Sequence, residues 1–192
     1  VEIVGKAGHA GTVPLNLRQD ALVTASECIV KLEKIAKASA NTVVTVGEIL
    51  IKPGASNVIP GNAQFTVDLR STENSVRTKV ENEIQQALQE ICTKRKTKLI
   101  TTKTHSAEST ICSKNVINQL DDAFVKSGHP TYFLPSGAGH DTAAMSDLTE
   151  TGMIFLRCRE GISHNPAESV KMGDIEVGFQ IMLKFIENFK PL

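Results

Sequence analysis

The chain has 192 residues, of which 41% are hydrophobic, and its 21 Lys and Arg residues balance 21 Asp and Glu residues. This composition is that of a folded globular protein and excludes intrinsic disorder. The net charge of zero gives no electrostatic sign of a nucleic-acid or membrane partner, and no apolar run approaches the ~20 residues that span a bilayer.

The four cysteines are widely spaced and form no CxxC pair, so the sequence predicts neither a zinc finger nor a redox dithiol. Cys28 and Cys92 fall on apolar helical stripes, and we interpret both as core residues. Unpaired thiols favour a reducing compartment, and we therefore expect a cytoplasmic protein.

The first elements are a strand, a loop and a helix. The chain opens inside a strand-like segment at residues 1–4, from which we expect it to be a piece of a longer protein. After a Gly-rich loop, a helix is predicted to begin near Pro14, because proline is favoured in the first turn. Its apolar positions recur every three or four residues, which predicts an inward stripe. The stripe consists of Leu17, Ala21, Ala25, Cys28, Leu32 and Ile35.

Two further strands are predicted at residues 42–51 and 63–71, followed by a second amphipathic helix and a strand at residues 98–104. Apolar and polar residues alternate in the segment 63–71, so Arg70 is expected to point to the open face of the sheet, away from the helices. The order β-α-β-β-α-β matches the ferredoxin-like plan, in which both helices cover one face.

From about Ile111 the pattern becomes that of an α/β domain. We expect helices over residues 115–128 and after a capping Asp174, with a strand and a short helix within residues 131–148. The apolar run at residues 151–158 predicts a buried strand. Two such strands are too few for a sheet covered on both faces, so the remaining strands are expected elsewhere in the protein.

Three of the five histidines lie in Gly-rich stretches: His9 in GKAGHAG, His140 in SGAGHD and His164 in GISHNPAE. Small neighbours let a ligand approach the backbone, and loops at strand ends commonly carry sites. We expect His140 and His164 to follow neighbouring strands. Metal binding by His164, with His140, Asp141 and Glu168 nearby, is one interpretation, although no HExxH pair supports it; acyl transfer lacks a GxSxG elbow.

Four stretches, GKAGHAGTVPLNLRQDA, GASNVIPGNAQFTVDLRS, SGAGHDTAAM and MIFLRCREGISHNPAE, resemble in this order the C-terminal half of the binuclear-zinc amidohydrolases related to aminoacylases and glutamate carboxypeptidases. The resemblance covers essentially the whole chain and is nearest to allantoate amidohydrolase and N-carbamoyl-L-amino-acid hydrolase. It implies an α/β protein with an α+β lid. Residues 1–110 would form a ferredoxin-like lid and dimerisation domain, and residues 111–192 the closing segment of a partial α/β zinc-peptidase-like catalytic domain.

The resemblance also implies roles for individual residues. His9 corresponds to the catalytic lid histidine that polarises the scissile carbonyl, usually across the dimer, and His164 corresponds to the last metal ligand. The substrate carboxylate would be held by lid side chains and by the Gly-rich loop. The substrate-binding residues that this implies are Asn57, Arg70, Gly137, Gly139 and His140.

The family uses two divalent metal ions (zinc, in some cases manganese or cobalt) to activate a water that a glutamate deprotonates. The other metal ligands and this glutamate have no counterpart among the 192 residues, so we expect this chain alone to hold an incomplete metal site or none and to be inactive. At Arg157 and Cys158 the family usually has a proline and a small residue. A buried charge at Arg157 would need a partner and could alter specificity.

The implied full-length protein is a homodimer, joined through the lid, that hydrolyses the C–N bond of a small carboxylate substrate, an N-carbamoyl amino acid or allantoate. The stretch SGAGHD favours the carbamoyl group. Two alternatives stay open: an N-acyl amino acid or peptide hydrolase on the same scaffold, and a non-catalytic dimerisation or ligand-binding module.

Overall fold

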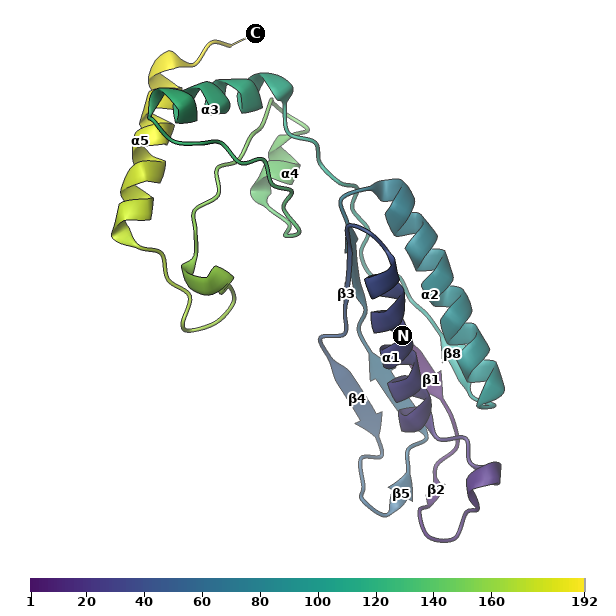
Figure 1. The fold of residues 1–192 in the computed structure, drawn as a ribbon. Coiled ribbons are helices and arrows are strands. Elements are labelled where there is room, and N and C mark those ends of the chain that lie inside the picture. The colour runs from purple at the N-terminus through teal and green to yellow at the C-terminus, as the bar shows by residue number, and fades with distance from the viewer. Residues whose placement is uncertain (192) are drawn as a thin grey trace. The chain divides into compact units, whose positions relative to one another are not determined.

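The computed structural model describes residues 1–191, which divide into an N-terminal unit, Val1–Ser109, and a C-terminal unit that begins at Thr110. Figure 1 shows strands and two long helices in the first unit, and helices joined by extended segments in the second. None of the helices in residues 1–191 combines the length and hydropathy needed to cross a bilayer.

The N-terminal unit is built on a four-stranded antiparallel sheet with the strand order β4-β6-β1-β8. Because β6 lies between β1 and β4, the β-α-β unit is split, as the ferredoxin-like plan requires. The predicted fold class is confirmed. The elements in chain order are β1 (Glu2–Val4), α1 (Ala21–Ala38), β4 (Ile49–Lys52), β6 (Asn62–Phe65), α2 (Asn74–Lys94) and β8 (Lys98–Ile100).

The hairpin of β4 and β6 continues beyond the sheet as β3 (Thr42–Thr45) paired with β7 (Asp68–Ser71). Between the two halves the ladder is interrupted, and the Thr66 amide donates to the Glu48 carbonyl at 3.1 Å. A second short pair, β2 (Gly8–His9) with β5 (Val58–Ile59), extends the opposite end of the unit (Figure 1).

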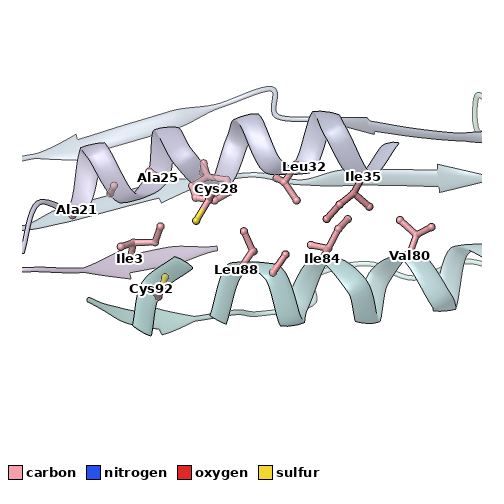
Figure 2. Close-up of a cluster of buried hydrophobic side chains, with 13 residues drawn as sticks. Ile3, Ala21, Ala25, Cys28, Leu32, Ile35, Val80, Ile84, Leu88 and Cys92 are labelled. Carbon is pink, nitrogen blue, oxygen red and sulfur yellow. The ribbon is translucent and has the colours of Figure 1, made fainter. Parts of the chain in front are cut away.

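Helices α1 and α2 face each other over the sheet and enclose the hydrophobic core, with Ile3 of β1 fully buried between them (Figure 2). The apolar spacing predicted this stripe on α1, because residues three and four apart share one helical face. The buried residues of the two helices include Ala21, Ala25, Cys28, Leu32, Ile35, Val80, Ile84, Leu88 and Cys92.

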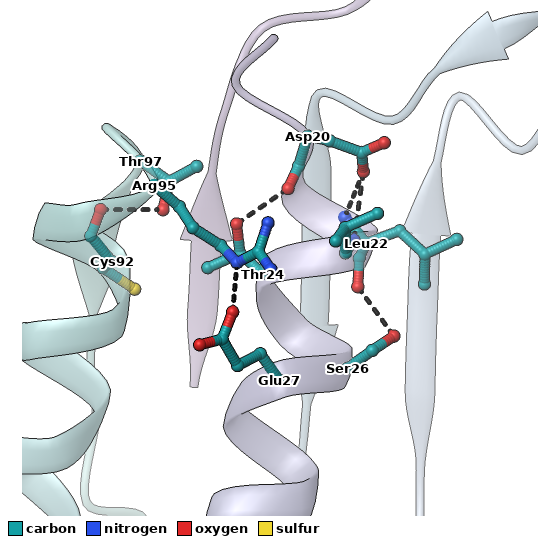
Figure 3. Close-up of polar contacts among 9 residues, drawn as sticks. Asp20, Leu22, Thr24, Ser26, Glu27, Cys92, Arg95 and Thr97 are labelled. Carbon is teal, nitrogen blue, oxygen red and sulfur yellow. Dashed lines mark hydrogen bonds and ion pairs between the residues drawn. The ribbon is translucent and has the colours of Figure 1, made fainter. Parts of the chain in front are cut away.

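The predicted start of the first helix near Pro14 is wrong. Residues Leu15–Leu17 form a separate 3-10 turn, and Leu17, expected in the inward stripe, is 68% exposed. Helix α1 begins at Ala21 because the Asp20 side chain caps it, accepting two hydrogen bonds of 3.0 Å from first-turn amides (Figure 3). A carboxylate at the N-cap accepts hydrogen bonds from the first-turn amides, which a proline side chain cannot do. Asp20 is therefore a stronger signal for the start of the helix than Pro14.

Polar contacts also join the two helices. The ion pair between Glu27 of α1 and Arg95, the residue that ends α2, bridges them at the edge of the core (Figure 3). Both side chains are about one-third exposed, so this pair adds modestly to the apolar packing beneath it.

The buried thiols Cys28 and Cys92 both belong to the core between the two helices (Figure 2). Burial raises the pKa of the Cys28 thiol from 9.0 to about 12, and burial also raises the pKa of Cys92. The other cysteines, Cys112 and Cys158, are partly exposed. The core pair should therefore remain protonated at neutral pH.

A thiol-specific disulfide reagent at pH 8 is expected to modify Cys112 and Cys158 of the folded chain within minutes and to leave Cys28 and Cys92 unmodified until urea is added. Equal labelling rates for all cysteines in the folded chain would contradict this prediction.

The raised pKa of Cys28 also predicts how stability depends on pH. Because the folded-state pKa of Cys28 is raised, the unfolded chain releases that proton at a lower pH than the folded chain does. The free energy of unfolding should thus be unaffected below about pH 9 and fall as the pH rises above it.

The C-terminal unit contains α3 (Lys114–Lys126), α4 (Asp141–Met145) and α5 (Met172–Asn188). The three predicted helices are therefore present, and α3 packs on α5. At their contact, Val116 and Leu120 of α3 and Ile181 of α5 are buried.

The two strands predicted in this unit, within residues 131–148 and at residues 151–158, are wrong for the described residues, which form only an isolated bridge between Cys158 and Val170. His140 and His164 consequently do not follow strands. A strand needs backbone partners along its edges, and the described part of this unit supplies no sheet on which the apolar run could pair. Leu156 is accordingly 44% exposed.

Two expectations for the end of the chain also need correction. Asp174 does not cap α5 but lies in its first turn, where it forms an ion pair with Arg157. Arg157, which falls in the run predicted as a buried strand, has a side chain that is 85% exposed, so solvent and the ion pair with Asp174 together stabilise its charge.

Candidate functional site

His9 and Asn57 are brought together at one end of the N-terminal unit. His9 lies in β2 opposite Val58 of β5, and the next amide, that of Ala10, donates to the Asn57 carbonyl at 2.9 Å. The residues His9 and Asn57 are both exposed. The two residues that the family resemblance assigns to the substrate thus lie on adjacent, hydrogen-bonded segments.

Glycines allow this end of the unit to close tightly. The Gly5 amide donates to the Gly61 carbonyl at 2.8 Å, and a Cβ on Gly5 would lie only 2.0 Å from the Gln19 carbonyl oxygen. A Cβ on Gly61 would lie 2.9 Å from the Ala7 amide nitrogen. Only residues without a side chain permit this approach, which holds the His9 loop against the chain that leads into α1.

The His9 ring has one defined partner. The Gly11 amide donates to His9 Nδ1 at 3.0 Å, so Nδ1 acts as the acceptor. In the neutral ring the proton then resides on Nε2, which becomes a hydrogen-bond donor to whatever lies beyond the loop. A neutral donor of this kind is suited to polarising a carbonyl oxygen.

Arg70 lies on β7 with the orientation that alternation predicted. Its side chain is 48% exposed, whereas Leu69 packs against the helix-covered core. Asp68, two residues earlier and on the same face, receives hydrogen bonds from Arg70 Nε at 2.9 Å and Nη2 at 2.6 Å. Hydrogen bonding from Arg70 lowers the pKa of Asp68, and Asp68 raises the pKa of Arg70. Sequence reasoning missed Asp68, although its spacing from Arg70 along a strand is the signal.

Arg70 is not placed beside His9. Arg70 lies eight positions beyond Asn62 along the β6–β7 strand, while His9 lies in the β2–β5 pair at the other end (Figure 1). At the usual rise per strand residue, the two ends are separated by roughly 25 Å. Within one copy of the unit, His9 and Arg70 therefore cannot contact the same small molecule.

The Gly-rich loop of the C-terminal unit precedes α4. His140 is the residue before this helix, and its Nε2 lies 2.7 Å from Ser136 Oγ, which also accepts a hydrogen bond from the Ala138 amide at 3.1 Å. Gly137 and Gly139 are exposed, and a Cβ on either would meet nothing within 4 Å. Packing within this unit therefore does not explain these glycines, whereas close approach of a ligand to the backbone would.

His164 adopts a left-handed backbone conformation with φ of 55°. Its amide donates to Glu168 Oε2 at 2.9 Å, and the Glu168 amide donates to the Asn165 carbonyl at 2.9 Å. Glu168 therefore stabilises the turn, in which His164 is exposed.

No group of three or more His, Cys, Asp or Glu residues that could hold a metal ion occurs within residues 1–191. His164 is suited to supply one imidazole ligand, but these residues alone do not fit a complete two-metal centre, which needs three or four protein ligands for each ion.

Comparison with known protein families identifies the family of this chain. Residues 1–96, half of the chain, match the model of the peptidase dimerisation domain, M20_dimer, so the chain belongs to this family. The whole length is similar to N-carbamoyl-L-amino-acid amidohydrolase of Pseudomonas sp. (strain NS671), at 39% identity over 97% of this chain and 45% of that protein. Allantoate deiminase 1 of Glycine max is 38% identical over 98% of this chain and 44% of its own length.

Solved structures show the same relationship. The crystal structure of AtUAH in complex with glyoxylate matches with a TM-score of 0.89 and 32% identity, covering 97% of this chain and 45% of that one. A hydantoinase/carbamoylase family amidase from Burkholderia multivorans matches with a TM-score of 0.91 and 27% identity, covering 100% of this chain and 47% of that one. The chain thus spans less than half the length of the relatives that it matches.

Proposed function

We propose that the chain is part of a metal-dependent amidohydrolase that hydrolyses the C–N bond of N-carbamoyl amino acids or allantoate. The observation that carries the proposal is the end-to-end similarity to an N-carbamoyl-L-amino-acid amidohydrolase and an allantoate deiminase. In this proposal, residues 1–110 are the lid and dimerisation domain, and residues 111–192 are the closing segment of the catalytic domain.

Each predicted site residue has a chemical task in this reaction. His9 Nε2–H donates a hydrogen bond to the scissile carbonyl oxygen, whose negative charge grows during attack. Arg70 binds the substrate carboxylate through its planar guanidinium, and Asn57 donates its side-chain amide to the substrate. Backbone amides of Gly137 and Gly139, with His140 beside them, are also suited to holding a substrate carboxylate.

The metal ions would supply the activated water when bound, and His164 would hold one of them. Zinc is the proposed metal, since a neutral imidazole suits it, with manganese or cobalt as substitutes. The remaining tasks fall to residues of the chain: orienting the substrate, stabilising the carbonyl oxygen and excluding solvent.

We also propose that the enzyme is a homodimer. The match to a dimerisation domain supports this, and so does the separation of roughly 25 Å between the His9 and Arg70 ends, estimated from the strand rise. That separation far exceeds the length of an N-carbamoyl amino acid. If both residues bind one substrate molecule, Arg70 of one copy must meet His9 of the other.

The exposed apolar edge of the N-terminal unit is the proposed dimer surface. β4 ends the described sheet, and an edge strand presents backbone groups that a second copy can pair with. On the neighbouring outer face of α1, Val23 is 44% exposed and Val30 is 52% exposed, and on the strands Val43 is 57% and Leu50 is 53% exposed. Val43 and Leu50 lie on the open face of the strands and Val23 and Val30 on the outer side of α1, so a second copy would have exposed apolar side chains to cover on both sides of this edge.

A cytoplasmic location belongs to the same proposal. Cys28 and Cys92 are free thiols buried in the core, a state that a reducing compartment maintains.

The substrate proposal is tested by kcat/KM values of the full-length enzyme for N-carbamoyl amino acids, allantoate, N-acetyl amino acids and dipeptides. We expect the first two to exceed the others by at least about a hundredfold, since a site built around a polar group rejects analogues that lack it. Preference for N-acetyl amino acids or dipeptides would favour the alternative hydrolase. Absence of turnover of all four would favour a binding module.

Substituting Arg70 with alanine is expected to raise KM for carboxylate-bearing substrates about 30-fold or more, because a charge-assisted bidentate contact is lost. KM for the corresponding methyl esters should change little. Arg77→Ala, which removes another guanidinium from the same unit, serves as the matched control and should leave both KM values unchanged. Equal effects of Arg70→Ala on acid and ester would remove its carboxylate role.

A further inference from the structure

The Arg18 side chain donates hydrogen bonds to two backbone carbonyls of the loop that follows His9. Its half-buried side chain donates from Nη2 to the Ala10 carbonyl at 2.6 Å and from Nε to the Val13 carbonyl at 3.0 Å. These are charge-assisted hydrogen bonds from one rigid fork, and such bonds fix geometry better than neutral ones. Neither the similarity to known relatives nor the proposed chemistry assigns Arg18 a task.

The loop has only weak internal support. The amides of Thr12 and Val13 both approach the His9 carbonyl at 3.3 Å, which is long for a backbone hydrogen bond. The Ala10 amide is held by Asn57 at 2.9 Å, but this contact fixes the peptide group before Ala10 and not the one after it. The two Arg18 contacts are therefore the strongest polar restraints on residues 10–13.

The Ala10 carbonyl and the Gly11 amide belong to the same peptide group. In a planar trans peptide the C=O and N–H point in opposite directions, so a donor that fixes the oxygen also fixes the N–H. Here Arg18 holds the Ala10 oxygen at 2.6 Å, and the Gly11 N–H at the other end of the plane points to His9 Nδ1 at 3.0 Å. A cation on the carbonyl also polarises the peptide and strengthens its N–H as a donor.

The Arg18 backbone is itself well anchored. The neighbouring Gln19 carbonyl accepts the Lys6 amide at 2.8 Å, at the close approach that Gly5 permits, and Asp20 then caps α1. Arg18 thus contacts the loop from a rigid junction between the sheet and the helix.

We propose that Arg18 is a positioning residue for His9: through the Ala10–Gly11 peptide it holds the neutral imidazole ring in the tautomer that carries its proton on Nε2. The catalytic consequence rests on the proposed function, in which Nε2–H polarises the scissile carbonyl. The control of the tautomer does not rest on it. Without Arg18 the peptide is free to rotate, Nδ1 loses its donor, and the ring can place its proton on either nitrogen.

The tautomer is measured by long-range ¹H–¹⁵N correlation spectra of ¹⁵N-histidine-labelled chain at alkaline pH. In the unsubstituted chain, the His9 signals should show a protonated Nε2 and an unprotonated Nδ1. In Arg18→Ala, they should move to averaged shifts of a tautomer mixture. Arg77→Ala, which removes a guanidinium contact to the Ala107 carbonyl far along the chain from His9, should leave them unchanged. Unchanged His9 signals in a folded Arg18→Ala chain overturn the proposal.

Arg18→Lys is a second, more conservative variant that tests the proposal even if Arg18→Ala does not fold. An ammonium keeps the charge but cannot reproduce the fork, so we expect signals between those of the unsubstituted chain and a mixture. His9 signals in Arg18→Lys identical to those of the unsubstituted chain also overturn the proposal.

In the full-length enzyme, Arg18→Ala should lower kcat about tenfold, the equivalent of one hydrogen bond, with KM nearly unchanged. Arg18→Lys should restore part of the loss. A tautomer shift without any fall in kcat overturns the catalytic part. Absence of amidohydrolase activity in the unsubstituted enzyme defeats the proposed function but leaves the tautomer result standing.

Discussion

Replacing His9 with alanine in the full-length enzyme is expected to lower kcat about 10²- to 10³-fold, the usual effect of removing one donor to a developing oxyanion. KM should change little, because the bond strengthens as the carbonyl oxygen gains charge and contributes less to ground-state binding. His9→Gln, which keeps a neutral N–H donor on a more flexible side chain, should retain part of the activity.

The control for this substitution is His105→Ala. His105 is likewise exposed in the N-terminal unit, and it lies outside the Gly-rich stretches that contain His9, His140 and His164. The measurement is steady-state hydrolysis of an N-carbamoyl amino acid by each variant. Comparable losses in His9→Ala and His105→Ala, or a rise in KM with unchanged kcat, would speak against a carbonyl-polarising His9.

The second large effect concerns stability. Leu32→Ala should lower the free energy of unfolding of the N-terminal unit by about 3 kcal/mol, because truncation leaves a cavity in a packed core. Leu32 is only 1% exposed and lies in the α1 stripe that faces α2. Urea titration of the purified chain, followed by far-UV circular dichroism, measures this change.

Leu17→Ala is the matched control, since sequence periodicity assigns both leucines to one inward stripe. Leu17 is 68% exposed in the 3-10 turn that precedes α1, so its truncation should cost no more than about 0.5 kcal/mol. Equal costs at the two positions would mean that the helix extends back to Pro14 with Leu17 packed beneath it.

This contrast shows where local sequence signals were sufficient. The ferredoxin-like order and the outward orientation of Arg70 follow from periodicity, which each segment carries in its own residues. The start of α1 was misplaced because proline and aspartate both mark helix starts, and the capping bonds of Asp20 decide between them only in three dimensions.

Non-local features could not be predicted in the same way. The apolar run at residues 151–158 has the composition of a strand, but strand formation depends on partners that the run cannot encode. The contacts of Arg18 depend on a loop conformation fixed by glycines at positions 5 and 61. The contact of Asp68 with Arg70 is by contrast local, because the two residues lie two positions apart on one face of β7, and their spacing is a signal that the sequence does carry.

The most direct measurement uses mixed dimers of the full-length enzyme, in which a His9→Ala copy and an Arg70→Ala copy carry different affinity tags and are purified together. If each substrate molecule is held by Arg70 of one copy and His9 of the other, one of the two sites in every mixed dimer is intact. We predict recovery of about half the wild-type kcat per dimer, whereas each parent variant stays impaired. Mixed dimers as impaired as both parents would contradict an active site shared between the copies.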